Sequence, residues 1–342
     1  MQLREFLDAW QAPVPTMVLH TSGSTGAPKA IRVEKERMRA SARMTCRFLG
    51  LGKGDRALLC LPLDYIAGQM MVVRALTCGL QLLTVAPSSR PLQELVRREA
   101  AGALPDPIHF AAMVALQVEQ SLAHPREARL LRSIRHLIIG GGAVPPQLEQ
   151  KLRDFPHAVW STYGMTETLS HIALRRLNGD GASPWYEPLP GVRVGLNARG
   201  CLRIEAGHVC RRPLDTNDLA LLHEDGRRFR ILGRMDNVVC SGGLKLQLEE
   251  LEQTLRPHLP TPFLFTKVPH PQLGEAVVLL SAAGDVPSLV TLCRRALPRH
   301  SVPRWVWVVP RLPLTASGKP ARREAQEMAL RLLENHGQGA QE

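Results

Sequence analysis

Short apolar strands alternate with helical segments through the first two thirds of this 342-residue sequence, and this alternation limits the fold more than any other feature. Strands are predicted at residues 17–20, 30–33, 56–61, 81–85, 134–139 and 157–160, and helices at residues 36–49, 69–78 and 147–153. Such an order is typical of an α/β fold with a largely parallel sheet. From residue 191 the spacing shortens, with strands predicted at residues 192–195, 201–205, 219–222 and 229–232 and turns between them. This pattern predicts a small all-β section.

A different order follows Gly233-Arg234-Met235-Asp236. Helices are predicted at residues 248–256 and 288–297 and from about residue 322, with strands at 263–267, 276–281 and 305–309. The chain length fits about two domains at ~150 residues each. We therefore predict a large N-terminal domain of layered sheets and helices over residues 1–235, and a small α+β C-terminal domain over residues 236–342.

Composition excludes several classes of protein. The apolar run at residues 276–280 is far shorter than the ~20 residues of a membrane span. Charged residues at positions 4, 5 and 8 stand where a signal peptide is apolar, which predicts a cytoplasmic protein without a membrane span. The seven cysteines are scattered and never spaced C-x-x-C, so we expect buried thiols rather than disulfides or a zinc site.

The net charge of +12 would attract polyanions such as nucleotides, pyrophosphate, coenzyme A or nucleic acids. A nucleic-acid-binding protein is expected to carry a concentrated run of basic residues or aromatic residues interleaved with them. Here the arginines are spread along the chain and aromatic residues make up only 4%. We therefore expect no nucleic-acid partner.

The clearest motif follows the first predicted strand and combines hydroxyls, two glycines and a lysine. Backbone N–H groups of glycine turns, hydroxyl donors and a nearby cation together suit a polyphosphate. A proline precedes the lysine and an extended segment follows, so this is not the Gly-Lys-Ser/Thr loop that opens a helix. The alternative is a flexible Gly/Ser turn, which the strand–loop–strand context disfavours. The residues predicted to bind phosphate are Thr21, Ser22, Gly23, Ser24, Thr25, Gly26 and Lys29.

A second motif, residues 161–167 (STYGMTE), follows a predicted strand, where ligands of open α/β sheets gather. Tyr163 could stack on a base, Thr166 could donate to a phosphate, and Glu167 could hold Mg²⁺ through oxygen. Asp218, at the start of a predicted strand, could accept hydrogen bonds from ribose hydroxyls, and taken alone it also fits a turn cap.

Three further motifs lie nearer the C-terminus, at residues 233–236 (GRMD), 241–243 (SGG) and 313–319 (PLTASGK). Together with the first motifs, and in this order, they resemble the conserved motifs of the adenylate-forming superfamily of acyl-CoA ligases, luciferases and adenylation domains. The resemblance runs from about residue 16 to residue 323. Within the superfamily, the sequence is most similar to the o-succinylbenzoate-CoA ligases of menaquinone biosynthesis. This similarity is carried by residues 61–70 (LPLDYIAGQM), 74–76 (RAL) and 162–173 (TYGMTETLSHIA). The implied fold is that of acyl-adenylate-forming enzymes, shortened at the N-terminus.

The resemblance implies that a carboxylate attacks the α-phosphorus of ATP and that the thiol of coenzyme A then displaces AMP. It implies catalytic roles for Lys319, Thr166 and Glu167, with Glu167 also binding Mg²⁺. In addition to the phosphate loop, the resemblance implies that ATP is contacted by Gly141, Gly142, Ala143, Tyr163, Gly164, Asp218 and Arg234.

The resemblance also implies that the small domain moves. Lys319 would bridge the substrate carboxylate and the α-phosphate, a role that suits a compact ammonium on a flexible stem. The small domain would then turn about Asp236, withdraw that lysine and present Gly242 and Gly243 to the pantetheine arm of coenzyme A.

The acyl pocket is the part least defined by the sequence. An aromatic acid with a second carboxylate needs an apolar slot and a donor or cation at its far end. Tyr65, Ile66, Gly140 and His171 are candidates for the lining, and Arg74 is a candidate for the charge. The alternatives are that Arg74 is a surface residue of its helix and that His171 is a hydrogen-bonded strand histidine.

Some features depart from the superfamily pattern. Only twenty residues precede the phosphate loop, where most relatives carry a long N-terminal subdomain, so we expect a compact version. Asn217 replaces the glycine of the usual Thr-Gly-Asp, and Gln247 replaces the usual proline. Three readings stay open: an o-succinylbenzoate-CoA ligase, an enzyme that activates another aryl or short acyl acid or loads a carrier protein, and a relative without activity. The partners implied are a small carboxylic acid, ATP and coenzyme A, and a homodimer is one assembly that the resemblance allows.

Overall fold

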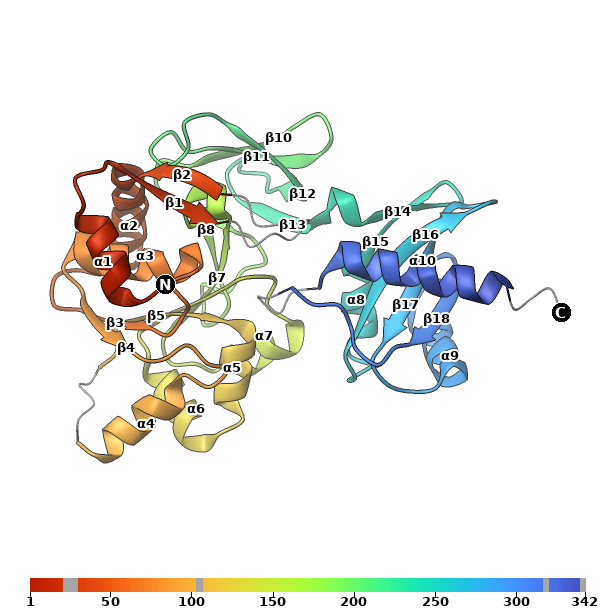
Figure 1. Ribbon diagram of the computed structural model, residues 1–342, viewed down its shortest axis with the longest axis horizontal. Coiled ribbons are helices and arrows are strands. Elements are labelled where there is room, and N and C mark those ends of the chain that lie inside the picture. The colour runs from red at the N-terminus through yellow and green to blue at the C-terminus, as the bar shows by residue number, and fades with distance from the viewer. Residues whose placement is uncertain (21–29, 103–106, 316–319, 339–342) are drawn as a thin grey trace.

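The chain forms two lobes that are joined near the strands β13 and β14 (Figure 1). The computed structural model describes residues 1–20, 30–102, 107–315 and 320–338. The predicted phosphate loop and Lys319 lie outside these described residues. In the described part of the chain, no helix is long and apolar enough to cross a membrane.

A seven-stranded sheet forms the centre of the large lobe. Five adjacent strands pair in parallel, as the alternating sequence pattern predicts. Each of the last two strands pairs antiparallel with the strand before it. The strands in order across the sheet are β4 (Gln81–Thr84), β3 (Arg56–Leu59), β5 (Phe110–Val114), β6 (His136–Gly140), β7 (Ala158–Gly164), β8 (His171–Arg176) and β9 (Glu187–Pro188).

Both faces of this sheet are buried, because alternate side chains of its strands enter two different cores. In β3, Ala57 and Leu59 belong to one core, and Leu58 belongs to the other. One face is covered by α1 (Leu3–Gln11), α2 (Lys35–Leu49) and α3 (Ile66–Cys78). The opposite face is covered by α4 (Leu92–Ala100), α5 (Ala115–Leu122), α6 (Pro125–Ser133) and α7 (Pro146–Leu152).

Two antiparallel sheets complete the large lobe. The first pairs β1 (Thr16–His20) with β2 (Ala30–Glu34). The second is the predicted all-β section, and its strands are β10 (Arg193–Leu196), β11 (Cys201–Glu205), β12 (Leu214–Leu222) and β13 (Phe229–Arg234). Strand β12 begins five residues before the predicted start. Asp218 therefore lies in the middle of a strand, and its prediction as a strand-start residue was wrong.

The small lobe is a five-stranded sheet with helices on both faces. Phe265 and Leu279 enter one core, whereas Leu264 and Val278 enter the other. Its strands are β14 (Val238–Ser241), β15 (Leu244–Gln247), β16 (Phe263–His270), β17 (Gly274–Ser281) and β18 (Trp305–Val308). Its helices are α8 (Leu248–Leu255), α9 (Val286–Ala296) and α10 (Arg322–Gln338), together with a 3₁₀ turn at Arg299–Ser301.

The cores of the two lobes are separate along the chain. The last core residue of the large lobe is Phe229, and the first of the small lobe is Val239. The segment between them contains the end of β13 and the 3₁₀ turn Met235–Asn237.

The prediction that the cysteines are buried thiols is confirmed for five of the seven. Cys78 is partly exposed, and Cys240 is exposed.

Candidate active site

Some of the predicted nucleotide and acyl residues end or follow strands at one edge of the seven-stranded sheet. Parallel strands end at a common edge, which is where ligands of such sheets bind. Tyr65 follows β3, residues 140–143 follow or end β6, and residues 163–167 end or follow β7. Strand β7 continues through Gly164, so residues 161–164 are strand rather than the predicted loop.

Close packing of β6 against β7 requires a glycine at position 140. A Cβ atom there would lie 2.8 Å from Oγ1 of Thr162 on the neighbouring strand. Gly141 follows with a left-handed φ of 86°, and Gly142 and Ala143 are exposed. The chain therefore leaves the sheet at this point with little side-chain bulk.

A tyrosine, a carboxylate and an arginine form one hydrogen-bonded unit between two sheets. The hydroxyl of Tyr163 donates to Oδ2 of Asp218 at 2.6 Å, and Nη1 of Arg234 lies 3.4 Å from Oδ1 of the same carboxylate. Asp218 and Arg234 face each other across β12 and β13. Burial, followed by the charge of Asp218 and the hydrogen bond to it, raises the pKa of Tyr163 well above its ordinary value. Its phenol therefore remains a donor.

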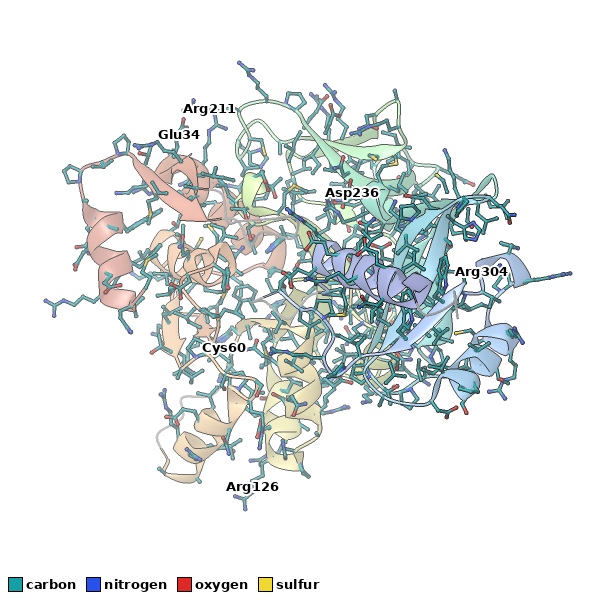
Figure 2. All side chains as sticks on the ribbon, turned by 45° about the vertical axis from the view of Figure 1, so that its right-hand side comes forward. Glu34, Cys60, Arg126, Arg211, Asp236 and Arg304 are labelled. Carbon is teal, nitrogen blue, oxygen red and sulfur yellow. The ribbon has the colours of Figure 1, made fainter. Side chains whose placement is uncertain are left out.

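The segment that joins the lobes is held by side-chain hydrogen bonds. Nη2 of Arg234 lies 3.1 Å from Oδ2 of Asp236, and Nδ2 of Asn217 donates to the same oxygen at 3.4 Å. Nε2 of Gln247 donates to the carbonyl of Arg234 at 3.1 Å and also to the carboxylate of Glu249. Figure 2 labels Asp236 where the β12–β13 region meets the small lobe.

Glu167 has the properties of a magnesium ligand. It lies in the 3₁₀ turn Thr166–Thr168 directly after β7, and its side chain is exposed. Within the described ranges, no hydrogen bond or ion pair reaches its carboxylate, and no group of three or more metal-ligating side chains is present. Mg²⁺ is usually held by one or two carboxylates together with phosphate oxygens and water. A single free carboxylate beside Thr166 therefore fits Mg²⁺ bound with a nucleotide and does not fit a closed metal cage.

Arg74 is fully buried, so the reading of it as a surface helix residue was wrong. Its side chain is 1% exposed, and Nη2 donates to Oγ of Ser170 at 2.7 Å and, more weakly, to Oγ1 of Thr45 at 3.4 Å. Nε has no hydrogen-bond partner, and in the described part of the chain no carboxylate forms an ion pair with the guanidinium. Burial lowers the pKa of Arg74 to about 10.

His171 lies beside Arg74 at the start of β8 and is buried. Its Nε2 lies 3.0 Å from Oγ1 of Thr45, and its Nδ1 lies 3.4 Å from Oγ of Ser170. Burial and then the charge of Arg74 hold the pKa of His171 well below its ordinary value, so the ring is neutral. These contacts fit the alternative interpretation of His171 as a hydrogen-bonded strand histidine.

Gly242 and Gly243 form the exposed turn of the β14–β15 hairpin. Both have positive φ values, 56° and 82°, which is the backbone conformation of a type I′ turn and favours glycine. The turn therefore explains why both residues are glycine, and their contact with coenzyme A stays a prediction.

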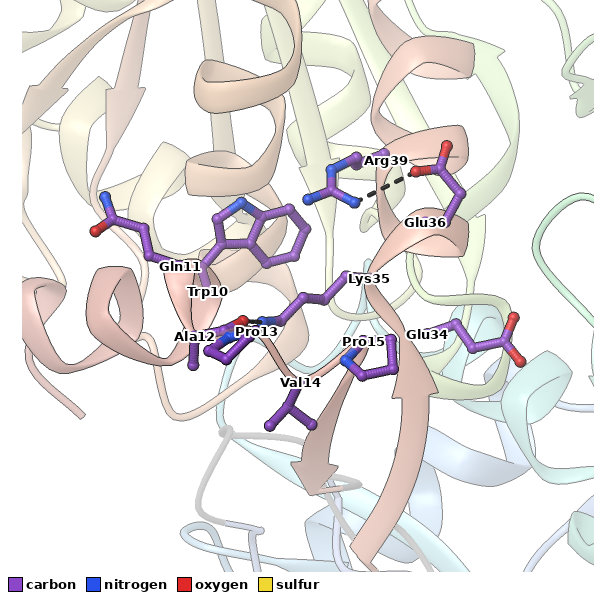
Figure 3. Close-up of a pocket in the computed structure, with 10 residues that line it drawn as sticks. All are labelled: Trp10, Gln11, Ala12, Pro13, Val14, Pro15, Glu34, Lys35, Glu36 and Arg39. Carbon is purple, nitrogen blue, oxygen red and sulfur yellow. Dashed lines mark hydrogen bonds and ion pairs between the residues drawn. The ribbon is translucent and has the colours of Figure 1, made fainter.

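A cavity of about 560 Å³ lies between the end of α1 and the start of α2 (Figure 3). Nζ of Lys35 donates to the carbonyl of Ala12 at 2.7 Å beside it, and Arg39 lies over the ring of Trp10. None of the described residues that line this cavity is a predicted site residue.

Sequence reasoning missed the neighbours of Arg74 and of Tyr163. Thr45 and Ser170 lie 29 and 96 residues from Arg74, so spacing alone could not connect them. One signal was available: Arg74 interrupts the apolar stretch of residues 70–76, and a charge in a helix that is apolar on every face is expected to be buried.

Known proteins match this chain along most of its length. The 2-succinylbenzoate–CoA ligase of Geobacillus kaustophilus is 27% identical and aligns with 91% of this chain and 69% of its own length. An acyl-CoA synthetase (AMP-forming)/AMP-acid ligase II-like protein from Dyadobacter fermentans is 34% identical, with 94% of this chain and 91% of that chain covered and a TM-score of 0.62. The o-succinylbenzoate CoA synthetase of Bacillus subtilis, solved with its acyl-adenylate intermediate, is 22% identical, covers 90% of this chain and 68% of its own, and has a TM-score of 0.75.

The fold is that of adenylate-forming enzymes, as predicted from the sequence. The chain belongs to the AMP-binding enzyme family, whose model matches residues 8–201.

Proposed function

We propose that the chain is an AMP-forming acid–thiol ligase that adenylates 2-succinylbenzoate with ATP and transfers the acyl group to coenzyme A. Arg74 is the observation that carries the choice of acid. A buried cation that forms no ion pair with a carboxylate costs free energy, which a bound carboxylate recovers. 2-Succinylbenzoate has two carboxylates, so one remains charged when the other reacts. The name of the Geobacillus kaustophilus relative supports the same acid.

The position of Arg74 connects it to the reacting centre. Ser170, which accepts the hydrogen bond from Arg74, lies two residues beyond the 3₁₀ turn that contains Thr166 and Glu167. The spectator carboxylate would therefore bind on the Ser170 side of the guanidinium. Tyr65, Ile66, Gly140 and His171 would line the apolar path between this point and the sheet edge.

In the first half-reaction, an oxygen of the acid attacks the α-phosphorus of ATP, and the bond to the β-phosphate breaks to release pyrophosphate. The main physical task is to hold two anions together, so fixed positive charge and positioning dominate. We assign the β- and γ-phosphates to the loop of residues 21–29 and the bridging cation to Lys319. Thr166 would donate to the α-phosphate.

The adenosine of ATP would bind across the ends of β6 and β7. Gly141, Gly142 and Ala143 would flank adenine together with Tyr163 and Gly164. Asp218 would accept hydrogen bonds from the ribose hydroxyls, with its orientation fixed by Tyr163 and Arg234. Glu167 would hold Mg²⁺, which neutralises phosphate charge when it is bound.

In the second half-reaction, the sulfur of coenzyme A attacks the acyl carbon, the acyl–phosphate bond breaks, and AMP leaves while the thiol proton passes to solvent. We propose that residues 236–342 turn about Asp236 between the two steps and bring Gly242 and Gly243 to the pantetheine arm. The separate cores on either side of residues 229–239 support a movement of this kind.

ATP–pyrophosphate exchange with a panel of acids tests the proposed function. We expect exchange with 2-succinylbenzoate and much less with two analogues that each lack one of its carboxylates. Adding coenzyme A, or in a parallel arm an acyl carrier protein, then identifies the acceptor by mass spectrometry of the product.

Equal exchange with a monocarboxylic analogue would contradict the role of Arg74 and favour a ligase for another aryl or short acyl acid. Loading of the carrier protein in place of coenzyme A would contradict the proposed acceptor. Absence of exchange with every acid, in protein that is folded by circular dichroism, would contradict the enzymatic function itself.

A further inference from the structure

Two cysteines from neighbouring helices meet beside Arg74. Cys46 lies in the last turn of α2, and Cys78 is the last residue of α3, four positions after Arg74 on the same face of that helix. The two helices pack against each other, and Sγ of Cys78 donates to the carbonyl of Ala42, one helical turn before Cys46, at 4.0 Å. Cys46 is 2% exposed, whereas Cys78 is partly exposed and is therefore accessible to small molecules.

The charges around the pair give the two thiols different roles. Hydrogen bonding from Cys46, with the nearby charges of Arg74 and Arg43, lowers the pKa of Cys78 to about 7, although burial opposes this. The same hydrogen bond, together with burial, raises the pKa of Cys46. Cys78 is thus the thiolate that an electrophile meets first, and Cys46 is the protonated neighbour behind it.

We propose that Cys46 and Cys78 are a redox-active thiol pair that reacts with low-molecular-weight disulfides and closes into an intramolecular disulfide. The Cys78 thiolate attacks one sulfur of the small disulfide RSSR, and RS⁻ leaves. The thiol of Cys46 then loses its proton and attacks the sulfur of Cys78, so that a second RS⁻ leaves. In total, two protein thiols are oxidised to one disulfide, and RSSR is reduced to two RSH.

Closure would change the surroundings of Arg74. A thiolate that faces the buried guanidinium is replaced by a neutral disulfide, and α2 becomes tied to the end of α3. Thr45, which precedes Cys46, contacts both Arg74 and His171. If the acid binds at Arg74, which rests on the proposed function, loss of the thiolate that competes for the guanidinium should lower the KM for the acid by about 5- to 150-fold, the usual range of coupling between two sites. The disulfide itself does not depend on that function.

Incubation of the full chain with oxidised glutathione, followed by peptide mapping by mass spectrometry, tests the thiol pair. We expect a Cys46–Cys78 disulfide and the loss of two hydrogen atoms, reversed by dithiothreitol. In Cys46→Ser, Cys78 should be trapped as a glutathione adduct, and in Cys78→Ser the buried Cys46 should stay unmodified. Cys240→Ser is the matched control, because this exposed cysteine lies in the small lobe and should leave the disulfide unaffected.

The proposal is overturned if the wild-type chain keeps Cys46 and Cys78 as free thiols under conditions that convert Cys240 to its glutathione adduct. A disulfide that joins either residue to a different cysteine would overturn it as well. The measurement on the wild-type chain is decisive even if a variant does not fold. If the disulfide forms and the KM for the acid does not change, the thiol pair stands, and the binding of the acid at Arg74 is contradicted.

Discussion

Replacing Arg74 with methionine should separate folding stability from acid binding. Methionine has a similar length and flexibility, so it fills much of the same space without charge. Burial lowers the pKa of Arg74 from 12.5 to about 10, which corresponds to about 3 kcal/mol for keeping the charge out of water. The guanidinium is charged in both the folded and the unfolded chain below pH 10. The cost is therefore constant between pH 6 and pH 9, and it is relieved only as the pH rises above about 10.

The charge also makes favourable contacts, which the substitution removes. The hydrogen bond to Ser170 is short and contributes about 2 kcal/mol, whereas the longer one to Thr45 contributes less. Both hydroxyls keep other contacts, since each lies within hydrogen-bond distance of His171. The substitution removes a burial cost of about 3 kcal/mol and hydrogen bonds worth about 2 kcal/mol. The free energy of unfolding should therefore stay unchanged or rise by about 1 kcal/mol, which raises Tm by about 2–4 °C for a domain of this size.

Acid binding should respond in the opposite direction. Truncating one partner of a buried charge pair costs about 2–5 kcal/mol, which corresponds to a roughly 30-fold to several thousand-fold increase in the KM for 2-succinylbenzoate. Urea unfolding of both proteins, with and without the acid, and ATP–pyrophosphate exchange measure the two effects. Destabilisation by more than about 2 kcal/mol together with an unchanged KM would refute the reasoning, because Arg74 would then serve the fold alone.

Lys319→Ala is expected to abolish acyl-adenylate formation but to spare thioesterification of a supplied acyl-adenylate, and equal loss in single-turnover assays of the two steps would contradict its role. Glu167→Gln should raise the Mg²⁺ concentration that gives half-maximal exchange by about tenfold or more, or about 1.4 kcal/mol; an unchanged Mg²⁺ titration would argue against this ligand. Asp218→Asn should raise the KM for ATP by a similar factor, and a KM equal to that of the wild type would remove Asp218 from the ribose site. Gln247→Ala should alter thioesterification more than adenylation, whereas identical effects on both rates would assign Gln247 to stability only.

The alternation of strands and helices predicted the fold because it reports which faces are buried. The predicted helix at residues 36–49 corresponds to α2, which begins one residue earlier, and the strand at residues 201–205 is β11. The hairpin of β14 and β15 was missed, because its strands are four residues each and its residues 238–247 are largely polar or exposed. Short strands of this kind are held by pairing with neighbours that the local pattern does not contain.

The candidate site could be predicted from the sequence only where its residues lie in continuous motifs. Tyr163 and Asp218 were predicted separately, each with its own role in nucleotide binding. Their direct hydrogen bond depends on how β7 and β12 pack, and that packing is a tertiary effect. Arg74 was named for its charge, but its complete burial depends on α2, β8 and the turn before β8, which are distant in sequence.

The two departures from the superfamily pattern converge on a single segment. Asn217 contacts the carboxylate of Asp236, and Gln247 contacts the backbone carbonyl of Arg234, so both side chains hold the chain between the lobes. A proline at position 247 would restrict the backbone permanently, whereas a hydrogen bond can break and form again at a cost of about 1 kcal/mol. A glycine at position 217 would supply no side-chain contact at all. The segment is therefore held by contacts that a turn about Asp236 can release, so these two substitutions are compatible with a moving small domain.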